Sequence, residues 1–145
     1  MPFLDSDVEE YLTKAKNISF SADFFPIADS SIIIICVPTP VYDNHTPDLT
    51  PVIGASDSVA AHLKKGQLVI LESTVNPGVC ESIVIPILEK ESGLKAGKDF
   101  FVAHCPERIN PGDKNWTVEN IPRVVGGLEE KSLEMAYEFY NSIIS

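Results

Sequence analysis

Three short stretches of the chain are continuously apolar, and longer stretches of mixed polarity separate them. The apolar runs cover residues 32–37, 68–71 and 100–103. A short run without polar alternation is typical of a strand that is buried on both faces, as in the middle of a parallel sheet. Pro38 and Pro40 follow the first run directly, and neither can donate a hydrogen bond to a neighbouring strand. The sequence therefore predicts three buried strands, the first of which ends abruptly.

Amphipathic stretches precede and separate these strands. Residues 5–16 carry acids early and lysines late, an order that suits the helix dipole, so they predict a short helix. A second helix is expected to begin with Thr50 as its N-cap and Pro51 in the first turn. Apolar residues at helical spacing follow, and Gly66 should close this helix.

Two further helices are predicted in the second half of the chain. One follows Pro77, should be kinked or interrupted by Pro86, and should stop at Gly93. The other covers residues 129–144 at the end of the chain. Its predicted buried face consists of Leu133, Ala136, Tyr137 and Tyr140.

Strand and helix therefore alternate along the chain, and residues 122–126 predict a short fourth strand. This alternation is the signature of an α/β fold with a doubly wound parallel sheet and right-handed crossovers. The chain has 145 residues, which is about one domain's worth, and 44% of them are hydrophobic, enough for a core. We expect a single domain.

Charge and cysteine content narrow the possible partners. The net charge is −10, which argues against nucleic acid or an anionic membrane surface, because both need basic patches. No apolar run approaches the roughly 20 residues of a membrane span, and the first residues do not resemble a signal peptide. Cys36, Cys80 and Cys105 show no metal-binding spacing and favour a reduced, cytoplasmic location, with Cys36 expected in a buried strand and Cys105 as an incidental thiol. We predict no metal site.

Polar, proline-rich turns follow all three predicted strands. Parallel strands would bring these turns to one edge of the sheet, where ligands of such folds bind. This edge would hold the hydroxyl groups of Thr39 and Thr74 and the charged side chains of Glu72, Glu107 and Arg108. The start of the helix after the second strand would add a positive dipole end suited to an anion.

Four motifs in these turns resemble the UDP-glucose/GDP-mannose dehydrogenase family. They occur in the order and spacing of that family and cover nearly the whole chain. The motifs are Val37-Pro-Thr-Pro40, Pro47-Asp-Leu-Thr50, Glu72-Ser-Thr-Val-Asn-Pro-Gly78 and Pro106-Glu-Arg-Ile-Asn-Pro-Gly112.

The last motif is most similar to the branch that oxidises UDP-N-acetylmannosamine or UDP-N-acetylglucosamine. UDP-glucose dehydrogenases carry Pro-Glu-Phe followed by Leu-Arg-Glu-Gly, and this chain has Pro111 in place of the second glutamate. The resemblance implies a Rossmann-like domain that binds NAD. It also implies a two-step oxidation of the sugar C6 hydroxyl to a carboxylate, a UDP-N-acetylhexosamine as substrate, and a homo-oligomer.

The resemblance also implies roles for individual residues. Glu107 matches a glutamate near the reacting carbon and its water, and a carboxylate can order a water for general-base chemistry. Arg108 and Ile109 match positions that touch the nucleotide sugar. The positions that match cofactor contacts are Val37, Pro38, Thr39, Ser73 and Thr74.

Several parts of the family pattern do not occur in these 145 residues. There is no GxGxxG, and the glycine-rich loop with the catalytic cysteine is also missing. We therefore expect residues 1–145 to be the second half of an NAD-binding domain, either cut from a longer protein or encoded as a truncated one, and inactive alone. The alternative is a non-catalytic α/β module that binds a nucleotide or a protein through the same edge.

Overall fold

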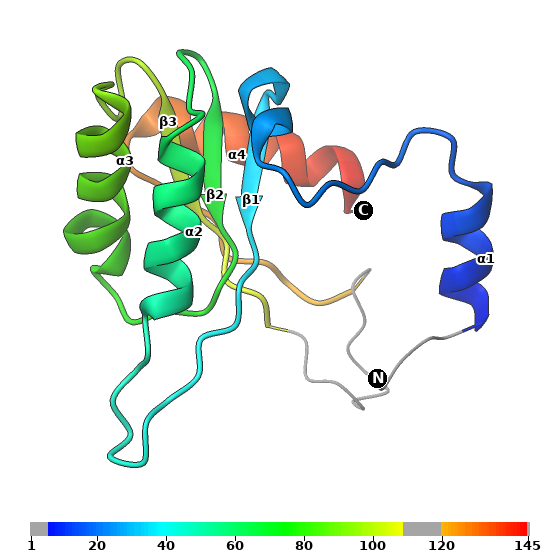
Figure 1. The fold of residues 1–145 in the computed structure, drawn as a ribbon, viewed down its shortest axis with the longest axis horizontal. Helices are drawn as coiled ribbons and strands as arrows, with labels where there is room; N and C mark the ends of the chain where they lie inside the picture. The colour runs from blue at the N-terminus through cyan, green and yellow to red at the C-terminus, as the bar shows by residue number, and fades with distance from the viewer. Residues whose placement is uncertain (1–5, 109–119, 145) are drawn as a thin grey trace.

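The computed structural model describes residues 6–108 and 120–144. A four-stranded sheet in the order β1-β2-β3-β4 lies at its centre (Figure 1). The strands β1 (Ile32–Ile35), β2 (Leu68–Leu71) and β3 (Phe101–His104) are parallel, whereas β4 (Gly126–Gly127) runs antiparallel to β3. The predicted α/β sheet is confirmed.

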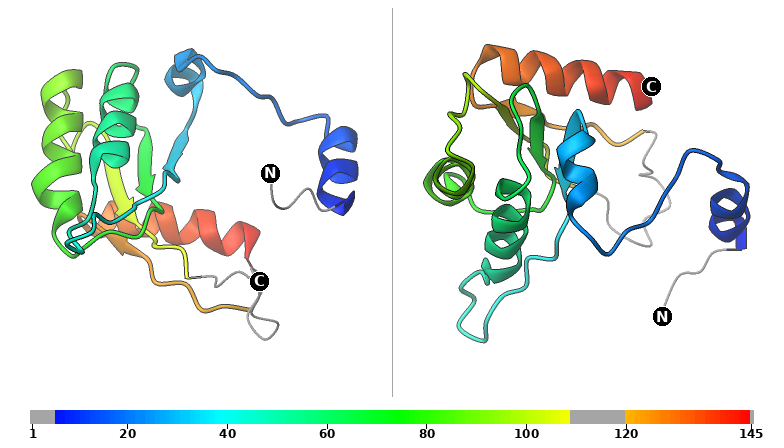
Figure 2. Two further views of the ribbon diagram at one scale, coloured as in Figure 1. Left: turned by 60° about the horizontal axis from the view of Figure 1, so that its bottom comes forward. Right: turned by 45° about the horizontal axis from the view of Figure 1, so that its top comes forward.

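Helices cover both faces of the sheet, as a doubly wound fold requires (Figure 2). The helix α2 (Thr50–Ala60) connects β1 to β2, and a π-helical turn, η2 (Cys80–Val84), leads into α3 (Ile85–Ser92) between β2 and β3. These elements pack on one face, and α4 (Glu130–Ile143) packs on the other. Successive side chains of a strand point to opposite faces of the sheet, and helices cover both faces. All four residues of β2 are therefore buried.

Pro86 interrupts the third helix as predicted. Proline has no backbone N–H, and the turn before it widens so that the Ile85 N–H reaches the Cys80 carbonyl. Gly93 then ends α3 in a left-handed conformation with φ 71°, which confirms the predicted stop.

The start of α2 differs from the prediction. Thr50 is the first helical residue, and the preceding Leu49 is the N-cap. The side chain of Asp48 accepts the Thr50 N–H at 2.9 Å, so an aspartate one residue further back fixes the start of the helix. The helix ends at Ala60, earlier than the expected stop at Gly66, and Gln67 Oε1 then accepts the Lys64 N–H at 2.6 Å.

Two predicted strands are too long. The first ends at Ile35, so Cys36 lies beyond it and is exposed rather than buried. The predicted fourth strand over 122–126 is reduced to Gly126–Gly127, and it is antiparallel. A parallel strand would need a crossover, usually a helix, between β3 and β4, and the described parts of that connection, residues 105–108 and 120–125, contain no helix.

The buried face of α4 is rotated relative to the prediction. Ala136 and Tyr140 are buried as expected, but Leu133 is 41% exposed and Tyr137 is 61% exposed, so both assignments were wrong. Ser132 takes the buried position instead, and its hydroxyl oxygen accepts the Val102 N–H of β3 at 3.0 Å. A polar anchor that apolar spacing cannot reveal thus sets the rotation of the helix.

The N-terminal part of the chain packs little against the sheet. The helix α1 (Ser6–Lys14) stands apart from the body in every view (Figures 1 and 2). The 3-10 turn η1 (Phe25–Asp29) is tied to the body by Gln67 Nε2, which donates to the carbonyls of Ile27 and Ser30 at 2.6 Å each. None of the helices in the described ranges has the length and apolar character needed to cross a membrane.

Candidate functional site

The three predicted turns meet at the carboxyl edge of the sheet. Backbone hydrogen bonds join them directly: the Glu72 N–H donates to the Ile35 carbonyl at 3.0 Å, and the Glu107 N–H donates to the Glu72 carbonyl at 3.1 Å. The parallel register of β1, β2 and β3 continues into these bonds. The structure therefore brings the candidate residues of all three turns onto one edge.

Ser73 holds the first turn against the second. Its hydroxyl accepts the Val37 N–H at 3.0 Å and donates to the Val37 carbonyl at 2.7 Å. The side chain is buried, so these bonds replace solvent contacts. They fix the backbone on which exposed Pro38 and half-buried Thr39 follow.

Thr74 and Glu107 lie next to each other. The Thr74 hydroxyl is exposed and donates to the Glu107 carbonyl at 3.3 Å. The Glu107 side chain is 40% exposed, and its Oε1 accepts the Arg108 N–H at 2.6 Å. The Arg108 guanidinium donates to the Pro122 carbonyl at 3.2 Å. Ile109, the other predicted sugar contact, lies outside the described residues.

Arg123 is a site component that sequence analysis missed. Its guanidinium bridges two carboxylates from different turns: Nη1 lies 3.2 Å from Glu72 Oε1, and Nη2 lies 2.9 Å from Glu107 Oε2. It also lies over the ring of Tyr140, 5.5 Å from the centroid. The Tyr140 hydroxyl donates to Glu72 Oε1 at 2.6 Å. These four residues, Glu72, Glu107, Arg123 and Tyr140, are called the carboxylate cluster below.

The surroundings of this cluster perturb several groups. Burial, and then the hydrogen bond to Glu72, raise the pKa of the Tyr140 phenol well above its usual range, so it stays a hydrogen-bond donor. Burial alone would lower the pKa of Arg123, but Cys105, Glu107 and Glu72 raise it above its ordinary value. Burial and the adjacent Glu72 carboxylate raise the pKa of the Cys36 thiol to about 12.

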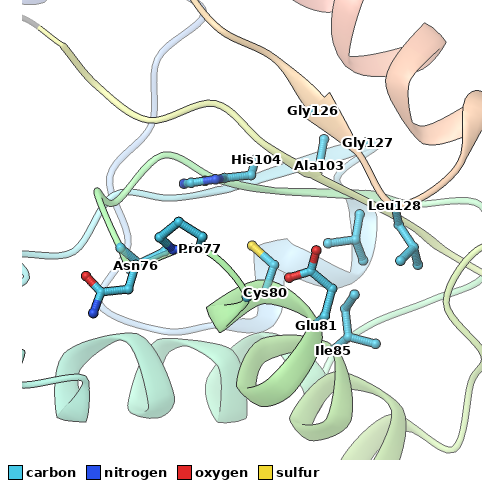
Figure 3. A pocket seen from close by; sticks show the side chains of 13 residues that line it. Asn76, Pro77, Cys80, Glu81, Ile85, Ala103, His104, Gly126, Gly127 and Leu128 are labelled. Atoms are coloured by element: carbon cyan, nitrogen blue, oxygen red, sulfur yellow. The ribbon is translucent and has the colours of Figure 1, made fainter.

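A cavity of about 260 Å³ opens beside this edge, between η2 and the strands β3 and β4 (Figure 3). Figure 3 shows Cys80 and Glu81 on the helical wall and His104 and Ala103 on the strand wall. Burial raises the pKa of the Cys80 thiol to about 11, so it is a poor nucleophile. Of the predicted site residues, those within the described ranges do not line this cavity. In the described ranges, His, Cys, Asp and Glu side chains form no group that could hold a metal ion.

Comparison with known proteins decides the family. The model of the "UDP-glucose/GDP-mannose dehydrogenase family, NAD binding domain" matches residues 1–144. The chain belongs to the UDP-glucose/GDP-mannose dehydrogenase family. The match covers the Rossmann-like sheet and all three turns of the carboxyl edge, so the fold and the NAD-binding character agree with the resemblance of the motifs.

Several family members are similar over nearly the whole chain. The UDP-N-acetyl-D-glucosamine 6-dehydrogenase of Pseudomonas aeruginosa is 42% identical over 142 residues, which are 98% of this chain and 33% of that protein. The solved UDP-D-ManNAc dehydrogenase of Pyrococcus horikoshii has a TM-score of 0.86 and 35% identity, covering 99% of this chain and 34% of the solved one. A ternary complex of GDP-mannose dehydrogenase from Pseudomonas aeruginosa has the same TM-score at 28% identity, covering 97% of this chain and 34% of its own. The chain thus spans about a third of the length of the curated relatives it matches.

Within this family domain, the structure separates the two glutamates of the edge. Glu72 accepts hydrogen bonds from Arg123, Tyr140 and the thiol of Cys36, and its side chain is 18% exposed. Glu107 is more than twice as exposed. Glu72 is therefore held inside the domain, whereas Glu107 faces the surface on which a ligand would approach.

Proposed function

We propose that the chain forms the second half of the NAD-binding domain of a UDP-N-acetylhexosamine 6-dehydrogenase. The observation that carries this proposal is the position of Glu107 at the carboxyl edge of the sheet, where its side chain is 40% exposed and its backbone carbonyl accepts the Thr74 hydroxyl. The relatives that support it include proteins named for UDP-N-acetylglucosamine and UDP-N-acetylmannosamine. A cytoplasmic location and a homo-oligomeric state remain predictions.

The residues of the edge fit NAD in type. The first turn presents Thr39 on a backbone that Ser73 fixes, with Val37 and Pro38 before it, and the second turn presents the exposed hydroxyl of Thr74. The positive charge of Arg123 offsets the negative charges of Glu72 and Glu107, which reduces the electrostatic repulsion of an anionic dinucleotide. NAD, when bound, supplies the acceptor for the hydride that leaves C6 of the sugar.

Glu107 is the residue proposed to act in the reaction. A carboxylate whose side chain is 40% exposed can order the water that converts an enzyme-bound acyl group to a carboxylate. Arg108 is proposed to bind the nucleotide sugar, since a guanidinium suits a phosphate, and Ile109 is proposed as a neighbouring contact. The cysteine nucleophile that the family resemblance implies would come from outside residues 1–145.

The proposal is tested with the complete enzyme that it implies. We expect NADH formation from UDP-N-acetylglucosamine or UDP-N-acetylmannosamine and much less from UDP-glucose, monitored by absorbance. The isolated 145-residue chain should form no NADH, because the thiol nucleophile and the glycine-rich phosphate loop are both outside it. NADH formation by the isolated chain would contradict the proposal that the nucleophile and the phosphate loop lie outside it. A complete protein that binds nucleotides but forms no NADH would favour the non-catalytic alternative.

A further inference from the structure

Arg123 reaches two carboxylates with the fork of one guanidinium. Its side chain is 12% exposed and reaches Glu72 at the end of β2 and Glu107 after β3 with two different nitrogens. The fork of a guanidinium can bind two carboxylates at once, whereas an ammonium acts as a single point charge. Tyr140 completes this arrangement from the face of the sheet that α4 covers. Its ring lies under the guanidinium, and its hydroxyl donates to Glu72.

We propose that Arg123 is the positioning residue for Glu107, and that Glu72 and Tyr140 hold Arg123 in place. This inference rests on the proposed function, in which Glu107 acts on the substrate. Under this proposal, the segment just before β4 belongs to the site. Neither the sequence motifs nor the sheet topology indicates this.

The hydrogen bonds of Glu107 show how the positioning works. One carboxylate oxygen accepts the Arg108 N–H and the other accepts Arg123 Nη2, so both oxygens are fixed in direction.

Glu72 serves as the anchor because its own freedom is small. Arg123 and the Tyr140 hydroxyl both donate to Glu72 Oε1, and the Cys36 thiol donates to Glu72 Oε2 at 3.2 Å. The backbone of Glu72 is fixed between the turns after β1 and β3. Any movement of Arg123 away from Glu107 would therefore break contacts with Glu72 and with Tyr140 at the same time.

The inference is tested in the complete enzyme with Arg123→Met, Arg123→Lys, Tyr140→Phe and Glu107→Gln. We expect Arg123→Met to lower kcat by about 10- to 100-fold, as for a misplaced catalytic group, with less than about a twofold change in KM. The acidic limb of log kcat against pH should move upward by about one to two pH units, because the variant removes a positive charge that lies 2.9 Å from the Glu107 carboxylate, and a nearby positive charge favours an ionised acid. Arg123→Lys should restore the acidic limb but only part of kcat.

The outcomes separate this inference from the proposed function. If Glu107→Gln leaves kcat unchanged, the role of Glu107 is wrong and the proposed function loses its main support. Two results would overturn only the positioning role, provided that Glu107→Gln abolishes turnover. Arg123→Met could keep the kcat of the unmodified enzyme, or it could lower kcat without shifting the acidic limb of the pH profile. Lys131→Met serves as the matched control, since it removes one positive charge from a side chain on α4 that is 61% exposed, and it should have no effect.

Two measurements keep the test decisive if Arg123→Met fails to fold. Arg123→Lys and Tyr140→Phe are milder, and parent values of kcat and of the acidic limb in both would overturn the inference. In the 145-residue chain itself, NMR should show resolved Nη protons of Arg123 that exchange slowly with water. Glu107→Gln should speed their exchange, and an unchanged rate would show that the contact does not hold the guanidinium.

Discussion

Gly127 is required by a close approach rather than by its backbone angles. A methyl group added there would lie 2.7 Å from Leu133 Cα and closer still to the Leu133 backbone nitrogen. Both are backbone atoms of α4, so neither can move aside cheaply. This contact explains the glycine at position 127, where β4 passes closest to α4.

We predict that Gly127→Ala lowers the free energy of unfolding by about 2 kcal/mol or more, because overpacking against backbone must displace α4. Gly126→Ala is the matched control, since open space surrounds that position. Its effect should stay within about 0.5 kcal/mol. Urea unfolding followed by circular dichroism measures both, and equal stability of the two variants would contradict the packing described for β4.

Cys36 is predicted to be an exposed thiol of low reactivity. Its pKa of about 12 leaves little thiolate at neutral pH, although the residue is exposed. Iodoacetamide at about pH 8 should modify it at least about tenfold more slowly than free cysteine. Glu72→Gln should raise this rate severalfold, since it removes one of the two main causes of the shift. Peptide mass spectrometry checks both rates, and labelling as fast as that of free cysteine would contradict the hydrogen bond to Glu72.

Glu107 and Arg108 are adjacent but should affect different kinetic constants. In the complete enzyme, Glu107→Gln should lower kcat far more than it raises KM, because the group acts in the transition state. Arg108→Ala should mainly raise KM for the nucleotide sugar, because its guanidinium is exposed and reaches only the Pro122 carbonyl among the contacts described. Steady-state kinetics with both variants tests this, and small, equal effects on both constants would remove the two residues from the site.

At the scale of elements, β1 is an edge strand. The carbonyls of Ser31 and Ile35 accept hydrogen bonds from the Leu68 and Glu72 N–H groups of the β2 side. Because the direction alternates along a strand, the backbone groups of Ile32 and Ile34 point to the open edge. Such an edge is a template for pairing with another chain.

We therefore predict that the isolated chain self-associates through β1. Ile34→Lys should weaken this association, because a charge on an edge strand opposes pairing. Ile53→Lys on α2 is the matched control, since Ile34 and Ile53 are both 38% exposed. Sedimentation velocity gives the mass of each species, and a chain that stays monomeric at millimolar concentration would refute the prediction.

The sequence predicts those elements whose signal is local. Continuous apolar runs indicate β1, β2 and β3, and the proline and glycine signals of α3 give its interruption and its end. Local patterns fail where a contact between distant residues determines which face of a helix is buried. The hydrogen bond between Ser132 and Val102 is the example, because it sets the face that α4 turns to the sheet. Local patterns also fail for the antiparallel direction of β4, because strand direction depends on how the chain returns from β3 and not on the residues of β4 themselves.

The same distinction applies to the site. The edge position of Thr39, Thr74 and Glu107 follows from parallel topology alone. The carboxylate cluster does not, because Arg123 lies 51 residues and Tyr140 lies 68 residues from Glu72 in the sequence. No spacing rule connects such residues, and only the folded chain shows that one guanidinium joins two turns.

At the scale of the whole molecule, the contact between Tyr140 and Glu72 joins parts of the chain that are translated at different times, because the two residues are 68 positions apart. Within residues 1–145, a ribosome makes β1, β2 and β3 with their turns before it makes Arg123 and α4. Until then the nascent sheet has no guanidinium between Glu72 and Glu107. Tyr140 can therefore hold Arg123 against Glu107 only after α4 has left the exit tunnel and docked, so a nascent chain has its sheet edge before it has its carboxylate cluster.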